Sequence, residues 1–172
     1  MSDAALRINL GGTERRDGWT IINPVPGPHV DIVGDHTALA GLADESVKEV
    51  YASHVLEHIR IFLETLMHMR RVLVLGGRLR VAVPDLIALA RLYLRPDLGL
   101  QDRWIVMRMI YGGHVDAFDE HHHGFDEATL HAYLVGAGFR DVRRVADFGL
   151  FGDTSVLMHK GVAISLNMEA WK

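Results

Sequence analysis

Two groups of histidines hold the side chains most suited to chemistry. The first lies in the run Ser53 to His58, which follows an apolar stretch and contains His54, Glu57 and His58. Imidazole changes its charge near neutral pH, so His54 could accept a proton or orient a substrate. A structural interpretation is equally compatible with the sequence: Ser53 caps a helix, Glu57 pairs with His54 across one turn, and His58 supports the helix.

The second group lies later in the chain and combines imidazoles with carboxylates; it comprises His114, Asp116, Asp119, His121, His122 and His123. Such side chains together suit divalent cations. Three consecutive histidines cannot all point the same way on a regular element, however, and no pair has a clear helical ligand spacing. We therefore expect no metal here and favour a solvated or substrate-facing loop.

A glycine pair, Gly11-Gly12, follows the apolar run at residues 6 to 10. Without a Cβ, backbone at such positions can approach a ligand closely, although an ordinary exit from a strand into a turn also explains the pair. In an open α/β sheet, ligands bind where the carboxyl ends of strands open into loops. We therefore expect the loop at Gly11 and the loop at Ser53 to line one crevice.

The elements that position these loops follow from hydrophobic periodicity. Apolar and polar periods alternate in a strand-helix order, which predicts a mostly parallel sheet, interrupted by a proline-rich loop at residues 24 to 28. Residues 97 to 124 are irregular or helical and have no firm assignment. Strands are expected at residues 6 to 10, 19 to 22, 47 to 52, 78 to 83, 139 to 145 and 155 to 166, and helices at residues 55 to 73, 85 to 94 and 126 to 136.

Composition indicates one compact domain over residues 1 to 172. Apolar residues make up 49% of the chain and charged residues 23%, with a net charge of -4, which favours neither disorder nor binding to nucleic acid. The chain has no cysteine, so disulfides and thiolate metal sites are excluded. No signal-peptide pattern and no membrane-spanning apolar run is found, and a cytoplasmic protein is the default expectation.

Five short motifs follow one another between residues 6 and 147. Through these motifs and their order, the chain resembles the small class I S-adenosylmethionine-dependent methyltransferases, and the ordered set is more specific than any single motif. The resemblance implies an α/β fold with a mostly parallel Rossmann-like sheet flanked by helices and a late antiparallel strand. The motifs are Gly18-Trp19, Ser-His-Val-Leu-Glu-His at residues 53 to 58, Gly-Gly-Arg-Leu-Arg-Val at residues 76 to 81, Val83-Pro84-Asp85 and His123-Gly124-Phe125.

The resemblance also implies S-adenosylmethionine as the cofactor. Its binding residues would be Gly11, Gly12, Asn23, Asp35, His36 and Ser53. Two positions depart from the family: Thr13 stands at the second glycine of the usual Gly-x-Gly loop, and Asn23 replaces the acidic residue that binds the ribose hydroxyls. The Asn23 amide oxygen could still accept one of those hydrogen bonds, or Asn23 could merely start the proline-rich turn.

Asp35 and His36 occupy the family position near the adenine. There, the Asp35 carboxylate would accept a hydrogen bond from the adenine amino group, and His36 would flank the base. On its own, Asp35 would more often be a turn former or a helix cap.

The activity that the resemblance implies is methyl transfer to oxygen or nitrogen of a small metabolite. His54, His121 and His123 are the catalytic candidates, and residues 92 to 124 are the expected substrate lid. The alternative is a catalytically inactive methyltransferase-like binding or scaffold protein. A nicotinamide oxidoreductase is less well supported because a full Gly-x-Gly-x-x-Gly fingerprint is missing. Apolar positions such as Ile110 and Leu150 would serve either the core or a homodimer interface.

Overall fold

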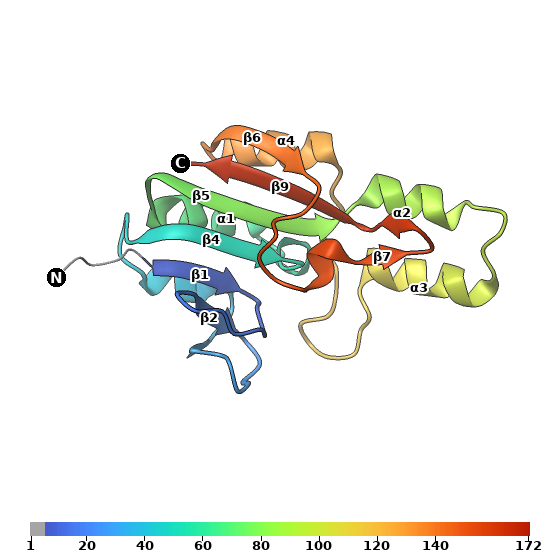
Figure 1. The fold of residues 1–172 in the computed structure, drawn as a ribbon, viewed down its shortest axis with the longest axis horizontal. Coiled ribbons are helices and arrows are strands. Elements are labelled where there is room, and N and C mark those ends of the chain that lie inside the picture. The colour runs from blue at the N-terminus through green and yellow to red at the C-terminus, as the bar shows by residue number, and fades with distance from the viewer. Residues whose placement is uncertain (1–5) are drawn as a thin grey trace.

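The computed structural model describes residues 6–172. Residues 1–5, which belong to the segment considered for a signal peptide, lie outside this part of the chain. Its centre is a seven-stranded sheet in the order β3-β2-β1-β4-β5-β9-β6 (Figure 1). Strands β1 to β5 pair in parallel, and β9 runs antiparallel between β5 and β6. This order confirms the predicted mostly parallel sheet with a late antiparallel strand.

The elements have the following bounds. The strands are β1 (Leu6–Leu10), β2 (Thr20–Asn23), β3 (Ile32–Val33), β4 (Val47–Ser53), β5 (Leu73–Pro84), β6 (Arg140–Val145), β7 (Met158–His159), β8 (Val162–Ala163) and β9 (Ser165–Trp171). The α-helices are α1 (Phe62–Val72), α2 (Leu86–Tyr93), α3 (Leu100–Tyr111) and α4 (Glu127–Gly136), and the 3-10 turns are η1 (His36–Gly41), η2 (Leu56–His58) and η3 (Thr154–Val156). Within residues 6–172, no helix combines the length and the apolar character needed to cross a membrane.

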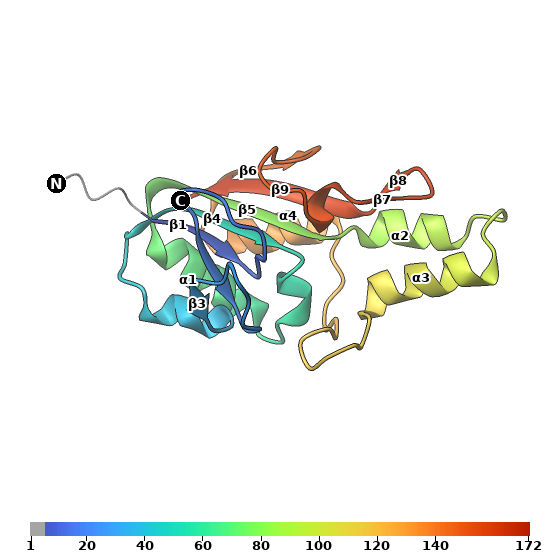
Figure 2. The same ribbon diagram turned by 60° about the horizontal axis from the view of Figure 1, so that its bottom comes forward.

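One face of the sheet is apolar and packs on helices. Alternate strand residues such as Ile8, Val50 and Val81 join Leu66 of α1 and Leu130 of α4 in the main core. Figure 2 shows α1 and α4 together beneath the sheet. Full burial of one such side chain stabilises the fold by about 1.5–3 kcal/mol, so this face is a main source of the stability of the sheet.

The opposite face of the sheet carries a buried ion-pair network as well as a buried aromatic cluster around Tyr51. Arg80 of β5 lies between Glu49 of β4 and Glu169 of β9, and its Nε is 3.0 Å from a Glu169 carboxylate oxygen. Arg143 of β6 donates to the other Glu169 oxygen over 2.9 Å. Since strand side chains alternate between faces, the same strands that build the core also place these charges together.

Glu169 makes the stability of the fold depend on acid. Burial opposes its charge, but the hydrogen bonds from Arg143 and Arg80 outweigh that effect, so the pKa of Glu169 lies below its usual range. A lowered carboxyl pKa contributes stability above the unfolded pKa of about 4.3, and this contribution is lost as pH falls through the folded pKa. We expect Glu169→Gln to lower the thermal midpoint at neutral pH and to make its decline below about pH 4 shallower.

Thermal melts of the wild type and Glu169→Gln at a series of pH values between neutral and strongly acidic test this expectation. The matched control is Glu64→Gln, because the Glu64 side chain is exposed on α1 and its ion-pair partner is the exposed-face neighbour His68. Parallel curves for the wild type and Glu169→Gln would contradict the assigned role of the ion pairs.

The predicted helix over residues 55 to 73 is wrong in its first half. Residues 56–58 form the separate turn η2, and α1 begins only at Phe62. The reason lies in the loop between α3 and α4 that carries His121, His122 and His123, which we call the histidine loop. The amides of His122 and His123 donate to the Glu57 carbonyl over 2.7 and 3.3 Å. His123 Nε2 donates to the Arg60 carbonyl over 3.1 Å. These carbonyls are therefore used by a distant segment instead of by a continuous helix.

The other differences lie near the ends of β5 and β9. The strand β5 begins at Leu73, before the Gly76-Gly77 pair that was expected to precede it. The predicted strand at residues 155 to 166 is wrong, because that segment forms η3 and the β7–β8 hairpin before β9 starts at Ser165. Two helices begin where they were predicted, one after Pro84 and one after Phe125. Asp85 caps α2 and Asp126 caps α4 with its side chain.

An arm extends beyond the carboxyl end of β5. It consists of α2, α3 and the β7–β8 hairpin (Figures 1 and 2), with its own small core. That core includes Leu89, Leu92, Val106 and Ile164, from both helices and from the approach to β9. The part of the sequence that resisted assignment thus contains a regular helix, α3, followed by the loop that carries the histidines.

Candidate functional site

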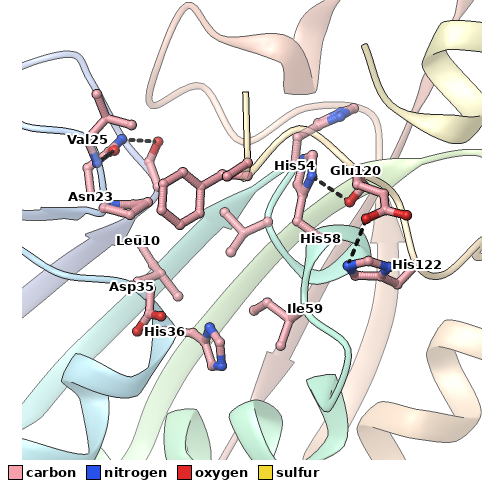
Figure 3. A pocket seen from close by; sticks show the side chains of 15 residues that line it. Leu10, Asn23, Val25, Asp35, His36, His54, His58, Ile59, Glu120 and His122 are labelled. Atoms are coloured by element: carbon pink, nitrogen blue, oxygen red, sulfur yellow. Dashed lines mark hydrogen bonds and ion pairs between the residues drawn. The ribbon is translucent and has the colours of Figure 1, made fainter. Parts of the chain in front are cut away.

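A cavity of about 260 Å³ opens at the carboxyl ends of β1, β2 and β4. We call it the strand-end cavity. Five of the predicted site residues line it: Gly11, Asn23, Asp35, His36 and His54. Figure 3 shows Asn23 and Asp35 on one side of it and His54 and His58 on the other. The shared crevice expected from the sequence therefore exists, and the loop after β3 contributes to it.

The Gly11 loop needs glycine for two physical reasons. Its φ angle of +77° is a left-handed conformation that side chains disfavour. A Cβ at this position would also lie 2.6 Å from Val55 Cγ2, far inside normal contact. A Cβ at Gly12 would collide with the buried amide of Asn9. The glycine pair thus lets the loop close down against its neighbours on both sides.

The Asn23 side chain binds the same loop from the end of β2. Its Nδ2 donates to the carbonyls of Gly11 and Gly12, each over 3.0 Å. Its Oδ1 accepts from the amide of Val25 over 2.9 Å. Both amide protons and one acceptor position are therefore used within the protein, and the residue holds the glycine loop and the proline-rich turn together.

Asp35 stands at the rim of the cavity as the N-cap of η1. Its Oδ1 accepts from the amide and the hydroxyl of Thr37, over 2.8 and 2.6 Å. The Thr37 hydroxyl is the main reason that the pKa of Asp35 lies below its usual range. The carboxylate therefore combines the capping role with a negative charge at the cavity wall, beside His36.

Gly12 and Ser53 lie apart from the strand-end cavity. They line a separate cavity of about 200 Å³, together with Asp153 and Thr154. Within the described residues, the buried Ser53 hydroxyl has no hydrogen-bond partner. Gly11 is the predicted residue that touches both cavities, so the loop separates them.

His54 has an unusual backbone, with φ of +53°, and two polar neighbours. Its Nε2 is 2.8 Å from Ser165 Oγ, and Ser165 Oγ in turn donates to the Thr154 carbonyl. A hydroxyl has one proton, so the His54 Nε2 must be the donor to Ser165. Its Nδ1 faces the carboxylate of Glu57 at 3.3 Å. No sequence signal pointed to Ser165, which reaches this site only because β9 lies beside β5.

Glu57 is fully buried in the middle of the histidines. Burial alone would favour the neutral acid, but the neighbouring imidazoles of His54 and His58 outweigh it, so the pKa of Glu57 is lowered. His58 Nε2 lies 4.0 Å from the same carboxylate oxygen. Sequence reasoning paired Glu57 with His54 across one turn, and the structure places the two together as expected.

The two predicted histidines of the later loop have different surroundings. His121 packs edge-on against His58, with ring centroids 4.5 Å apart, and its Nδ1 donates to the Ile110 carbonyl over 3.1 Å. Burial lowers the pKa of His121 and favours the neutral ring. His123 instead packs against Phe62 and bonds to the Arg60 carbonyl, so it does not line the cavities described here.

A third cavity, of about 490 Å³, opens on the other side of these histidines, and we call it the α3 cavity. His54 and His58 line both it and the strand-end cavity. The remaining wall of the α3 cavity combines apolar and charged side chains, among them Trp104, Arg108, Met109, Asp119 and His121. Arg108 and Met109 were not among the site residues predicted from the sequence, because α3 was not assigned. Asp119 was considered there only as part of the histidine and carboxylate group. The two cavities together offer adjacent spaces for two small molecules with imidazoles between them.

Comparison with known proteins supports the fold. No family model and no curated protein matches the sequence. Among solved structures, a SAM-dependent methyltransferase from Archaeoglobus fulgidus is similar over 99% of this chain and 87% of its own, with a TM-score of 0.63 and 15% identity. A methyltransferase from Mesorhizobium loti is similar over 97% of this chain and 90% of its own, with a TM-score of 0.58 and 14% identity.

A third similar structure holds ligands. It is the 1,6-didemethyltoxoflavin-N1-methyltransferase of Burkholderia thailandensis, with bound 1,6-didemethyltoxoflavin and S-adenosylhomocysteine. It is similar over 98% of this chain and 71% of its own, with a TM-score of 0.63 and 18% identity. At these identities the similarity concerns the fold, which is therefore the Rossmann-like fold of the class I S-adenosylmethionine-dependent methyltransferases.

Proposed function

We propose that this protein is an S-adenosylmethionine-dependent methyltransferase that acts on oxygen or nitrogen of a small metabolite. The observation that carries the proposal is the pair of adjacent cavities at the carboxyl ends of the strands, with His54 and His58 between them. In α/β folds this end of the sheet is where ligands bind, and methyl transfer needs a cofactor and an acceptor side by side. The fold is that of enzymes which perform this reaction.

The strand-end cavity is the proposed cofactor site. Its lining fits the cofactor because Gly11 brings backbone without a side chain to the cavity wall and Asp35 offers a carboxylate for the adenine amino group. His36 lies next to Asp35 at the same wall, suited to flank the base. Asn23 acts by holding the loop in place. When bound, the cofactor supplies an electrophilic methyl group on a positively charged sulfur.

The α3 cavity is the proposed acceptor site. Trp104 and Met109 offer apolar contacts, and Arg108 and Asp119 offer charges that could orient a polar substrate. Because a sulfonium is a good leaving group, positioning of the acceptor contributes more than proton transfer. We assign the orientation of the acceptor to His54 and His121. Residues 92 to 124, which contain α3, are the proposed lid over this site.

Binding of S-adenosylhomocysteine, measured by calorimetry, tests the cofactor site. Asp35→Asn keeps the oxygen that caps η1 but removes the charge, so we expect affinity to fall about tenfold, as for one lost charge-assisted hydrogen bond. The matched control is Asp17→Asn, since Asp17 is exposed and lies outside both cavities. Absence of binding to the wild type, or equal affinity for the wild type and Asp35→Asn, would contradict the assigned site.

Binding without turnover is the second candidate function. It is favoured by Thr13 at the second glycine position and by the Asn23 amide, whose protons are used inside the protein. An assay for release of S-adenosylhomocysteine from S-adenosylmethionine, run over a library of small phenols, alcohols and amines, separates the two functions. Product formation that depends on one acceptor supports the enzyme. Tight cofactor binding without product over the library supports a binding protein.

A further inference from the structure

We propose that Glu57, His58 and His121 form a binding site for a divalent transition-metal ion of the zinc type, with His54 next to the Glu57 carboxylate. From the sequence alone no metal is expected, because the three adjacent histidines cannot all point the same way and have no helical ligand spacing. In the fold, His121 meets residues that precede it by more than sixty positions. The carboxylate and the imidazoles then share one small volume between the strand-end cavity and the α3 cavity.

The spacing of the donor atoms fits one ion. One donor atom from each of Glu57, His58 and His121 lies within 4.8 Å of the others. Zinc binds nitrogen and oxygen ligands at about 2.0–2.2 Å in a tetrahedron, so its ligand atoms lie about 3.3–3.6 Å from one another. The three side chains would therefore draw together by rotation when an ion binds.

The buried Glu57 carboxylate lacks partners that would otherwise account for it. Its side chain is 0% exposed, and within residues 6–172 neither oxygen has a hydrogen-bond partner. The closest nitrogen, His54 Nδ1 at 3.3 Å, does not complete a hydrogen bond. Burial of an ionised carboxylate without a counter-charge or donors is strongly unfavourable, whereas coordination to a cation satisfies it.

The outer nitrogens of the histidines are already bonded in the way that metal ligands require. His58 Nδ1 donates to the Glu120 carbonyl over 3.2 Å, and His121 Nδ1 donates to the Ile110 carbonyl over 3.1 Å. Since a carbonyl only accepts, each Nδ1 carries the proton and each neutral ring has its lone pair on Nε2. For His54 the bond to Ser165 places the lone pair on Nδ1, which faces Glu57. Backbone partners of this kind orient metal-binding histidines.

The ligand set selects a class of metal. Imidazole nitrogens with one carboxylate and no thiolate suit Zn²⁺, Co²⁺, Ni²⁺ or Fe²⁺ more than Mg²⁺ or Ca²⁺, which prefer oxygen ligands. The ion would lie in the wall that His54 and His58 form between the two cavities. If the proposed methyltransferase function holds, it would there bind the acceptor atom directly and lower its pKa.

The competing account replaces the ion by a proton. In that account a protonated His54 neutralises Glu57, and the histidines form a structural network alone. The two accounts differ in their consequences: only a metal site binds Zn²⁺ with one equivalent, and only a metal site depends on His58 and His121 for that binding.

The test uses the full chain without a histidine tag, freed of metal with a chelator. Calorimetric titration with Zn²⁺ should give one equivalent of saturable binding, and Co²⁺ should give visible absorption bands of a nitrogen- and oxygen-bound ion. We expect His58→Ala and His121→Ala each to weaken Zn²⁺ binding by about tenfold or more. Circular dichroism checks that each variant folds. If His121→Ala does not fold, His58→Ala still tests the site, because His58 is partly exposed and its replacement should be tolerated better.

His131→Ala is the matched control, because His131 is exposed on α4, away from the cluster. Its Zn²⁺ affinity should equal that of the wild type. The proposal is overturned if the wild type shows no saturable binding, or if a folded His58→Ala or His121→Ala variant keeps wild-type affinity. No cofactor or acceptor enters this experiment, so its failure leaves the methyltransferase proposal standing, and failure of that proposal leaves the metal site standing.

Discussion

Asn23→Asp is expected to lower both the stability of the protein and its affinity for S-adenosylhomocysteine, although an acid is what the similar enzyme family carries at this position. The substitution removes the two protons that Asn23 donates to the Gly11 and Gly12 carbonyls. It also sets a carboxylate against two carbonyl oxygens. Loss of such donors costs about 1–3 kcal/mol for each acceptor left unsatisfied, so we expect the free energy of unfolding to fall by about 2 kcal/mol or more.

Urea unfolding and calorimetric titration with S-adenosylhomocysteine measure the two effects. Asn23→Ala is the control, because it removes the donors without adding a charge and should be the milder of the two changes. Tighter cofactor binding by Asn23→Asp than by the wild type would show that the carboxylate reaches the ribose. The interpretation of Asn23 as the residue that holds the loop would then be wrong.

Gly11→Ala is the second substitution with a large expected effect. A left-handed backbone costs a residue with a Cβ about 1–2 kcal/mol, and overpacking in a closed space costs about 1–3 kcal/mol. The new Cβ would lie 2.6 Å from Val55 Cγ2. We therefore expect a loss of about 2–4 kcal/mol in the free energy of unfolding, together with weaker cofactor binding. Urea unfolding measures the loss.

The double variant Gly11→Ala/Val55→Ala separates the two causes. Removal of the Val55 methyl groups should relieve the steric part and leave the backbone part, so the two substitutions should not be additive. Gly136→Ala is the matched glycine control, since a Cβ there meets no atom within 4 Å. Simple additivity in the double variant would mean that the Val55 contact is not the cause.

Most of the fold was predictable because its signals are local. Apolar alternation in residues 6 to 10 and 78 to 83 reports a strand whose neighbours lie on two faces, and that periodicity does not depend on which strand lies beside it. The capping residues Asp85 and Asp126 likewise each accept from an amide three positions away. The ends of elements were predicted less well than the elements themselves, because contacts with distant segments also decide where a helix or strand begins.

The candidate cofactor residues were predictable only in part. The loops after β1, β2, β3 and β4 had to converge, because the carboxyl ends of parallel strands meet at one edge. Gly11, Asn23, Asp35 and His54 were therefore expected at one edge of the sheet, and they line one cavity there. The direction of each side chain was not predictable: the Asn23 amide turns toward the loop carbonyls because those acceptors lie within its reach.

By itself, then, the sequence determined the α/β class, the parallel sheet and the edge of the sheet at which the candidate site residues gather. Only the tertiary structure decided where the helix after β4 starts, which residues form β9, and which histidines meet. Glu57 and His121 are brought together by hydrogen bonds between the Glu57 carbonyl and the amides of the histidine loop. Such a contact joins segments that are distant along the chain, and neither segment carries a periodic or capping signal that names its partner. The physical chemistry of the cluster therefore exists only after folding.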